Sequence, residues 1–296
     1  TVSLGPLSLD NPVCVASGTF GNGEEMAELI DIGRLGAIFL KGATRHAREG
    51  NAPQRIVETP AGLLNAIGLQ NPGIEETLRD KAPYVAAHHV PCIVNISGRS
   101  NEEYAEMAAM CDACAAITGV EMNVSCPNVA KGGMAFGTDA ATLRVAVSAA
   151  RDAMAKPLIV KLSPNVTSIA DMARAAADAG ADALSLINTL VGMAIDVRRR
   201  RPVLARGIGG LSGPAIRPVA VRMVWEVSRA VDIPVIGIGG IVTPHDALEF
   251  FVAGASAIQV GTASFFNPRA AVDILDGVTQ YMTDNNLESL GDLRAA

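Results

Sequence analysis

Short apolar runs recur along the chain, each followed by a polar or glycine-containing loop, and this alternation is the feature that most limits the fold. The runs are nearly continuous in apolar residues, which is typical of parallel strands that are buried on both faces. Eight strands are predicted, at residues 12–17, 36–41, 91–96, 120–125, 157–162, 182–187, 234–239 and 257–261.

Segments with helical periodicity lie between these strands. The predicted helices cover residues 24–32, 102–116, 140–155, 169–179, 215–231 and 244–253. Strands and helices alternating over 296 residues predict a (β/α)8 TIM barrel of the α/β class, as a single domain over residues 1–296. Residues 1–9 are expected to form a short β-hairpin that closes the bottom of the barrel.

A doubly wound open sheet has the same local pattern and is the alternative architecture. The nearest match to a dinucleotide-binding fingerprint lies at residues 207–212, where serine takes the place of the third glycine. Because this segment follows a polar run and not a strand, it supports the alternative only weakly.

Composition narrows the class of protein. The chain has 24 Lys and Arg against 30 Asp and Glu, a net charge of −6, which argues against a nucleic-acid partner. It is 49% hydrophobic and 18% charged, so a large core can form. No apolar run is long enough for a membrane span and no signal pattern is visible. The 5 scattered cysteines indicate reduced thiols. We therefore expect a cytoplasmic protein that binds no membrane.

Polar residues and glycines lie at or just beyond the carboxyl ends of the predicted strands. In a barrel of this kind the site forms at the carboxyl ends of the strands, so these residues should converge on one mouth. They are Ser17, Lys41, Asn95, Asn123, Lys161, Asn188, Thr189, Gly239, Gly240, Gly261 and Thr262.

The residue types at this mouth indicate the ligand chemistry. Gly239, Gly240, Gly261 and Thr262 follow the last two predicted strands, where backbone N–H groups of barrels commonly bind a phosphate. The two strand-end lysines should meet an anion, since an unpaired buried ammonium is costly, although either lysine could also form a Schiff base. Asparagines both donate and accept hydrogen bonds, which suits a planar, imide-like ligand.

Three further features allow a structural and a functional interpretation. Cys126 follows a strand end and precedes a glycine-rich segment that could act as a lid, which favours catalysis over simple burial. Cys111 and Cys114 form a CxxC pattern inside a predicted helix, without a second pair of ligands, so burial is favoured and no metal site is predicted. The arginine run at 198–201 is interpreted as a solvated loop, with a partner-binding surface as the weaker alternative.

Long motifs in the chain resemble those of class 1 dihydroorotate dehydrogenases, and most closely the class 1B catalytic subunit. The resemblance covers nearly the whole chain and rests on ASGTFG (16–21), KGAT (41–44), ETPAGLLNAIGLQNPG (58–73), NVSCPN (123–128), GGMAFGTD (132–139), VKLSPNVT (160–167), INTLVGM (187–193), GGLSGPAIRP (209–218), GIGGI (237–241) and VGTA (260–263). It implies an FMN-containing barrel that oxidises (S)-dihydroorotate to orotate in de novo pyrimidine (UMP) biosynthesis.

The resemblance also implies roles for individual residues. Cys126 would be the base that removes the C5 proton while a hydride passes from C6 to N5 of the flavin. The residues implied to bind substrate are Lys41, Asn65, Ala66, Ile67, Gly68, Leu69, Asn123, Asn188 and Thr189. Those implied to bind FMN are Ser17, Lys41, Gly42, Asn95, Asn123, Lys161, Ile187, Gly213, Gly239, Gly240, Gly261 and Thr262.

The subclass determines the electron acceptor. Cysteine at position 126 is similar to class 1, and the GGMAFGTD segment is similar to class 1B, which passes electrons to NAD through a partner subunit carrying FAD and a 2Fe-2S cluster. A homodimer core within a heterotetramer is implied. The alternatives are a fumarate-dependent, class 1A-like enzyme, a flavin-free Schiff-base lyase that uses Lys161 or Lys41, and a related pyrimidine substrate as in dihydropyrimidine dehydrogenase.

Overall fold

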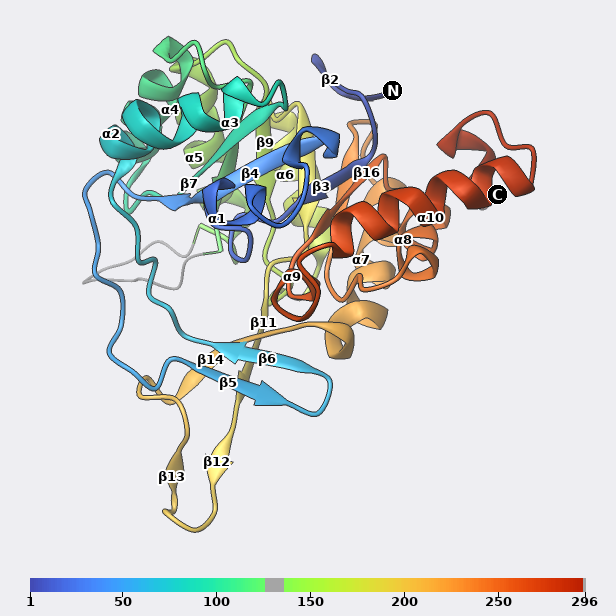
Figure 1. Ribbon diagram of the computed structural model, residues 1–296. Helices are drawn as coiled ribbons and strands as arrows, with labels where there is room; N and C mark the ends of the chain where they lie inside the picture. Colours follow the sequence, from blue (N-terminus) through green and yellow to red (C-terminus); the bar gives the residue numbers. More distant parts are fainter. Residues whose placement is uncertain (126–135, 295–296) are drawn as a thin grey trace.

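The computed structural model describes residues 1–125 and 136–294, and its centre is a closed barrel of eight parallel strands (Figure 1). The predicted (β/α)8 barrel is confirmed, and the open doubly wound sheet is wrong. The barrel strands are β3 (Val13–Val15), β4 (Ala37–Ala43), β7 (Cys92–Ile96), β8 (Gly119–Asn123), β9 (Leu158–Lys161), β10 (Ala183–Leu186), β15 (Val235–Ile238) and β16 (Ala257–Val260). The strands pair in chain order, and β16 pairs with β3 to close the ring.

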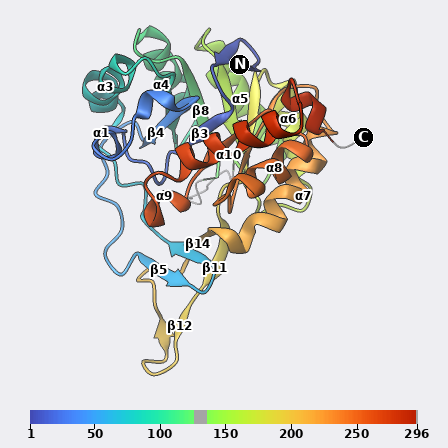
Figure 2. The same ribbon diagram turned by 45° about the vertical axis from the view of Figure 1, so that its right-hand side comes forward.

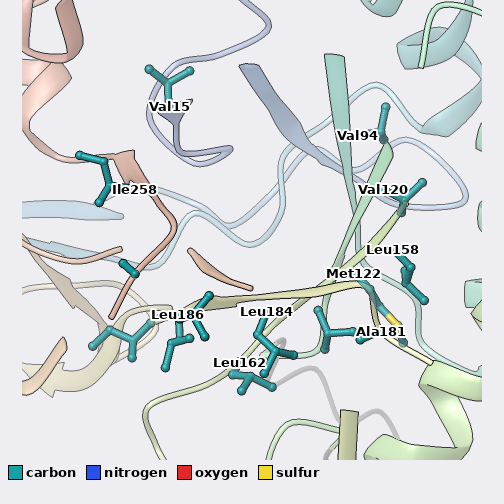
Figure 3. Close-up of a cluster of buried hydrophobic side chains, with 14 of the residues drawn as sticks. Val15, Val94, Val120, Met122, Leu158, Leu162, Ala181, Leu184, Leu186 and Ile258 are labelled. Carbon is teal, nitrogen blue, oxygen red and sulfur yellow. The ribbon is translucent and has the colours of Figure 1, made fainter. Parts of the chain in front are cut away.

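Side chains along the strands alternate between the barrel interior and the surrounding helices. The outward-facing residues belong to the large core between strands and helices; Figure 3 shows Val94, Val120 and Met122 from this layer. A smaller apolar cluster comes from the other face of the barrel strands and consists of Cys14, Ala37, Phe39, Ile93, Ile159, Ala183, Ile236 and Ala257, together with side chains of the N-terminal segment. The interior of the barrel is therefore packed and is not a pore.

The helices around the barrel are α4 (Asn101–Ala113), α5 (Ala140–Asp152), α6 (Ile169–Asp178), α7 (Arg217–Ser228) and α8 (Pro244–Val252). Four of them begin at a side chain that accepts a hydrogen bond from the first turn: Ser100, Asp139, Ser168 and Thr243. Such caps satisfy backbone N–H groups that have no partner within the helix. Their positions explain why these four helices begin at or next to the predicted starts, whereas α4 and α5 end before the predicted ends.

Other helices differ from the predicted pattern. The helix expected over 24–32 is only α1 (Glu24–Ala27), because the chain turns into a short 3-10 helix η1 (Ile32–Arg34) that is capped by Asp31. A helical stretch formed by α2 (Ile74–Glu76), the π-helical η2 (Thr77–Lys81) and α3 (Ala82–Ala87) was not predicted from the sequence. Nor were α9 (Ala263–Phe266), α10 (Ala270–Asp284) and the 3-10 helix η4 (Leu290–Leu293). The helix expected over 215–231 begins as the 3-10 helix η3 (Pro214–Ile216) and continues as α7.

A small antiparallel sheet lies at one end of the molecule and was not predicted. Its strands, in order, are β11 (Leu190–Met193), β14 (Ile208–Ser212), β6 (Gly62–Asn65) and β5 (Ile56–Thr59). A hairpin of β12 (Ile195–Asp196) and β13 (Arg201–Pro202) projects beyond it, as Figures 1 and 2 show. The segment that resembled a dinucleotide fingerprint forms β14, which lies between β6 and β11 and pairs with both. Arg198 to Arg201 are solvent-exposed in the turn and at the start of β13, as expected for a solvated loop, and the partner-binding surface stays the alternative prediction.

The N-terminal segment forms the hairpin β1 (Val2–Leu4) and β2 (Leu7–Leu9) at the opposite end of the barrel. Leu4, Leu7 and Leu9 are buried against the interior apolar cluster. The hairpin thus covers the amino ends of the strands and leaves the carboxyl ends for the site. Whether the chain is one domain stays a prediction. Within the described residues, none of the helices is both long and apolar enough to span a membrane.

Leu9→Ala should lower the free energy of unfolding by about 2–5 kcal/mol, because it opens a cavity in the closed end of the barrel. Leu9 is 1% exposed, whereas Leu29 is 55% exposed and offers a matched control. Urea unfolding followed by far-UV circular dichroism measures both variants. Equal losses for Leu9→Ala and Leu29→Ala would show that the hairpin is not part of the core.

Candidate active site

A polar layer lies directly above the interior apolar cluster. Two residues beyond Phe39, Ile93 and Ile159, the same faces of the strands carry Lys41, Asn95 and Lys161. Because side chains repeat with a period of two along a strand, these polar groups point into the barrel near its carboxyl end. The convergence expected from the sequence is therefore present in the structure.

Glu121 is the centre of this layer and was missed by the sequence analysis. It lies within β8, and its side chain is fully buried. One carboxylate oxygen accepts a hydrogen bond from Asn95 Nδ2 at 2.6 Å and lies 3.6 Å from Lys161 Nζ. The other accepts from Ser185 Oγ at 2.7 Å and from Gln259 Nε2 at 2.8 Å. A charged residue inside an apolar strand was the available signal, since such a charge is buried only with partners.

Asn123 at the end of β8 and Asn188 just after β10 are in direct contact, although β9 lies between these two strands in the barrel. Asn188 Nδ2 donates to Asn123 Oδ1 at 3.1 Å, and the Thr189 backbone N–H donates to Asn188 Oδ1 at 2.8 Å. Tyr104 on α4 donates its hydroxyl to the Asn123 carbonyl at 2.8 Å, which fixes the end of β8. Amide groups in this arrangement can bind a ligand that carries both donors and acceptors.

The small sheet joins the 65–69 segment to this asparagine pair. Asn65 Nδ2 donates to the Gly210 carbonyl at 3.3 Å, and a Cβ on Gly210 would lie 2.1 Å from Thr189 Oγ1. The half-buried segment from Asn65 to Leu69 is held by Asn51, whose amide donates to the Ala66 carbonyl at 2.8 Å and whose N–H donates to the Ile67 carbonyl at 2.8 Å. Only the tertiary structure places this distant segment beside the barrel mouth.

Lys41 lies in β4 with a half-buried side chain. Burial lowers the pKa of Lys41, and the positive charge of Arg55 lowers it further. Arg55 was not among the expected site residues. It is anchored by hydrogen bonds to the Asn51 carbonyl at 3.2 Å and to Gln70 Oε1. Cations held close together in a partly buried position favour an anionic ligand between them.

Glycines from two loops, together with Thr262 from a third, form a narrow cradle. Gly213, Gly239 and Gly240 all have positive φ angles of 93°, 131° and 74°. A Cβ on Gly240 would lie 2.8 Å from the Gly213 carbonyl oxygen, and a Cβ on Gly213 would lie 3.5 Å from Thr262 Cγ2. Thr262 is held by a 2.8 Å hydrogen bond to Ser212. Because these glycines carry no side chains of their own, a ligand can approach their backbone closely, which fits a phosphate bound by N–H groups.

The remaining expected cofactor residues line the same mouth. Ile187 is buried, and its N–H donates to the Ile238 carbonyl at 2.9 Å, beside Gly239. A Cβ on Gly261 would lie 3.7 Å from Ala16 Cβ, so Ser17 is next to the Gly261 loop. A Cβ on Gly42 would lie 2.8 Å from Asn95 Oδ1. That Asn95 oxygen is buried and accepts no hydrogen bond among the described residues, so it can serve a ligand N–H.

The structure addresses only one of the two predictions about cysteines. Cys126 and the start of the glycine-rich segment lie outside the described residues, so the catalytic assignment stays a prediction. Cys111 is buried on α4, and burial raises its pKa to about 12, which leaves an unreactive thiol. Cys114 is not inside the helix as expected but at its end, because α4 stops at Ala113. Both thiols are free, and among residues 1–125 and 136–294 there is no metal-binding cluster.

Comparison with known proteins identifies the family. The family model described as dihydroorotate dehydrogenase matches residues 1–282. The chain belongs to this family. It is 56% identical over 296 residues to the "Dihydroorotate dehydrogenase B (NAD(+)), catalytic subunit" of Pelobacter propionicus, with 100% of this chain and 97% of the relative covered. Proteins of the same name in Trichlorobacter lovleyi and Desulforamulus reducens are 54% and 52% identical, with the same coverage.

These comparisons confirm the resemblance to the class 1B catalytic subunit that the motifs indicated. The chain is an oxidoreductase of the dihydroorotate dehydrogenase family, and the family implies FMN as its cofactor. The name of the relatives also implies a separate partner subunit. The Schiff-base lyase and the fumarate-dependent enzyme are not favoured.

Proposed function

We propose that this chain oxidises dihydroorotate to orotate in pyrimidine biosynthesis, with FMN in the barrel mouth and electrons passed to NAD through a partner subunit. The observation that carries the proposal is the convergence of the Lys41 and Arg55 cations, the Asn123–Asn188 pair and the glycine cradle at one end of the barrel. This set provides an anion site, a planar hydrogen-bonding site and a phosphate site within one mouth.

The substrate is held by groups of matching chemistry. Lys41 binds the carboxylate of dihydroorotate, and Arg55 adds to the positive potential there. Asn123 and Asn188 exchange hydrogen bonds with the ring N–H and C=O groups, supported by Thr189. The segment Asn65, Ala66, Ile67, Gly68 and Leu69 closes the remaining side of the ring.

The cofactor is held at both of its ends. Gly213, Gly239, Gly240, Gly261 and Thr262 bind the phosphate through backbone N–H groups. Around the ring system we place Ser17, Lys41, Gly42, Asn95, Asn123, Lys161 and Ile187. When bound, FMN supplies the two-electron acceptor for the oxidation. Lys161 holds a positive charge toward the ring and so favours negative charge that develops on it.

Cys126 is the base in this proposal. It takes the proton from C5 of dihydroorotate, and the short sequence distance from Asn123 allows its thiol to reach the substrate that Asn123 orients. A free thiol has a pKa of about 8.5, so the substrate complex must favour the thiolate or accept the proton transfer in step with oxidation.

The partner carries the remaining redox groups. We infer a subunit with FAD and a 2Fe-2S cluster, because the relatives are named as catalytic subunits of an NAD(+)-linked enzyme and the class 1B enzymes that the motifs resemble use such a subunit. A homodimer of this chain at the centre of a heterotetramer, located in the cytoplasm, completes the proposal.

Anaerobic spectroscopy tests the function. The purified chain should be yellow, and dihydroorotate should bleach the flavin absorbance. A colourless protein that takes up no added FMN would contradict the proposal. Reoxidation should be fast with NAD and the copurified partner, and slow with fumarate. Fast reoxidation by fumarate without a partner would instead support the fumarate-dependent enzyme, and borohydride trapping of a carbonyl substrate on Lys161 or Lys41 would support the lyase.

Gly240→Ala should weaken FMN binding by about 100-fold or more, because a methyl group there would lie 2.8 Å from the Gly213 carbonyl inside the phosphate cradle. Gly207→Ala is the matched control: its φ is +83°, close to the +74° of Gly240, but nothing lies within 4 Å of the added Cβ. Titration of each apoprotein with FMN, followed by flavin fluorescence, gives the affinities. Similar losses in both variants would mean that backbone strain, and not the cradle, causes the effect.

A further inference from the structure

The fully buried carboxylate of Glu121 has no role in substrate binding, cofactor binding or proton transfer in the proposed function. Its neighbours come from β7, β9, β10 and β16, so it joins four strands across the barrel interior. Below it lies the apolar cluster that contains Cys14, whose pKa is raised to about 12, first by burial and then by the charge of Glu121. Above it lie two of the residues placed around the cofactor ring, Asn95 and Lys161.

Among the described residues, the polar side chains that hydrogen-bond to Glu121 all act as donors. The hydrogen atoms come from the amides of Asn95 and Gln259 and the hydroxyl of Ser185, and the ammonium of Lys161 lies close by as an ionic partner. An ionised carboxylate is acceptor-only, whereas a protonated carboxyl or an amide would bring a donor against these donors. The arrangement therefore fits Glu121 as an anion.

Among the described residues, Lys161 is the cation that forms an ion pair with Glu121. The Lys161 and Glu121 side chains are 8% and 0% exposed, so solvent screens their interaction little. At 3.6 Å the contact is ionic, and Lys161 Nζ donates no hydrogen bond within the described residues. The N–H groups of the Lys161 ammonium thus remain available to a ligand, while the Glu121 carboxylate balances its charge.

Resting on the proposed function, we propose that Glu121 is a positioning residue that balances the charge of Lys161 and thereby lowers the reduction potential of the bound FMN. An uncompensated ammonium beside the ring would stabilise the reduced, anionic flavin strongly and retain the electrons. The carboxylate offsets part of that field, which favours onward transfer to an acceptor such as NAD. The hydrogen bond that Glu121 accepts from Asn95 Nδ2 also orients the Asn95 amide. Its Oδ1, a buried acceptor that has no partner among the described residues, therefore points away from Glu121 and toward Gly42.

Glu121→Gln tests the charge with little change of shape. The amide removes the negative charge, and Ser185 and Gln259 can reorient to accept from it. Sulfite adds to N5 of oxidised flavins and gives an anionic adduct, so its affinity reports the positive charge beside the ring. Sulfite affinity of the FMN-loaded variant should rise about tenfold, and the two-electron potential should become more positive by about 30 mV, the shift equivalent to that factor.

Ser185→Ala is the matched control, because it removes one hydrogen bond to the same carboxylate but keeps the charge. Its sulfite affinity should stay within about twofold of the wild type. Equal sulfite affinities in Glu121→Gln, Ser185→Ala and the wild type would overturn the inference. If the wild-type holoenzyme is yellow and is bleached by dihydroorotate, that outcome leaves the proposed function intact; a wild type without FMN would contradict the proposed function itself.

A measurement on the wild type covers the case in which Glu121→Gln does not fold. The infrared difference spectrum of the holoenzyme between oxidised and reduced flavin should contain bands of an ionised carboxylate that change on reduction. Labelling with ¹³C-glutamate assigns these bands to glutamate. A band of a protonated glutamate carboxyl in the oxidised enzyme at neutral pH, with no carboxylate response, would contradict the charge assigned to Glu121.

Discussion

Cys126→Ala is expected to lower turnover at neutral pH by about 10²–10⁴-fold, the usual contribution of a general base. Alanine removes the only group near the end of β8 that we assign to take the C5 proton, while the barrel, the cofactor cradle and the asparagine pair remain. FMN content and orotate affinity should therefore stay near the wild-type values. Stopped-flow measurement of flavin bleaching by dihydroorotate under anaerobic conditions separates this step from later electron transfer.

Two further variants test this prediction, one at another cysteine and one that replaces the Cys126 thiol by a hydroxyl. Cys114→Ala changes a half-buried thiol at the end of α4 and should leave flavin reduction unchanged. Cys126→Ser should keep part of the activity and gain rate as pH rises, because a hydroxyl loses its proton less readily than a thiol. Flavin reduction at the wild-type rate in Cys126→Ala would remove Cys126 from its assigned role.

Lys41→Met should weaken orotate binding by at least about 30-fold, or about 2 kcal/mol, because it removes the cation assigned to the substrate carboxylate. Methionine keeps most of the volume and the apolar stem of lysine. The affinity can be measured from the change in the flavin spectrum on titration with orotate. FMN content should change less than orotate affinity, since the phosphate is held elsewhere.

The orotate affinity of the wild type is also expected to depend on pH, through the protonation of Lys41. Burial, with the charge of Arg55, lowers the pKa of Lys41 in the free protein. An incoming carboxylate favours the protonated lysine and raises that pKa, so binding takes up a proton between the two values. Orotate affinity of the wild type should therefore fall as pH rises through the lowered pKa, below the usual value of about 10.4. Lys41→Met should lack this contribution.

Lys81→Met is the matched control, because Lys81 forms a partly exposed ion pair with Glu24 at 2.9 Å and has no assigned contact with substrate. Such pairs contribute about 0–1 kcal/mol to stability, so this variant should fold and bind orotate normally. Equal losses of orotate affinity in the two variants would argue against a carboxylate site at Lys41.

The sequence predicted the barrel because the information for it is local. Continuous apolar strands, capped helices and their alternation each depend on neighbouring residues, and the closed sheet follows from their number and order. The same reasoning located Lys161, Asn123 and the Gly239–Gly240 pair at strand ends. It failed for helix α10 and for the helical stretch from Ile74 to Ala87, whose residues had been left outside the strand and helix pattern.

The small sheet and the Glu121 network required the tertiary structure. Asn65 reaches Gly210 across 145 residues of sequence, and Gln259 reaches Glu121 across 138, so no local pattern could indicate either contact. The sequence by itself determined which residues end the strands and, through its motifs, the family. The folded chain decided which of these residues meet, because closing the barrel brings the first and last strands together and places a buried carboxylate where only four strands jointly can satisfy it.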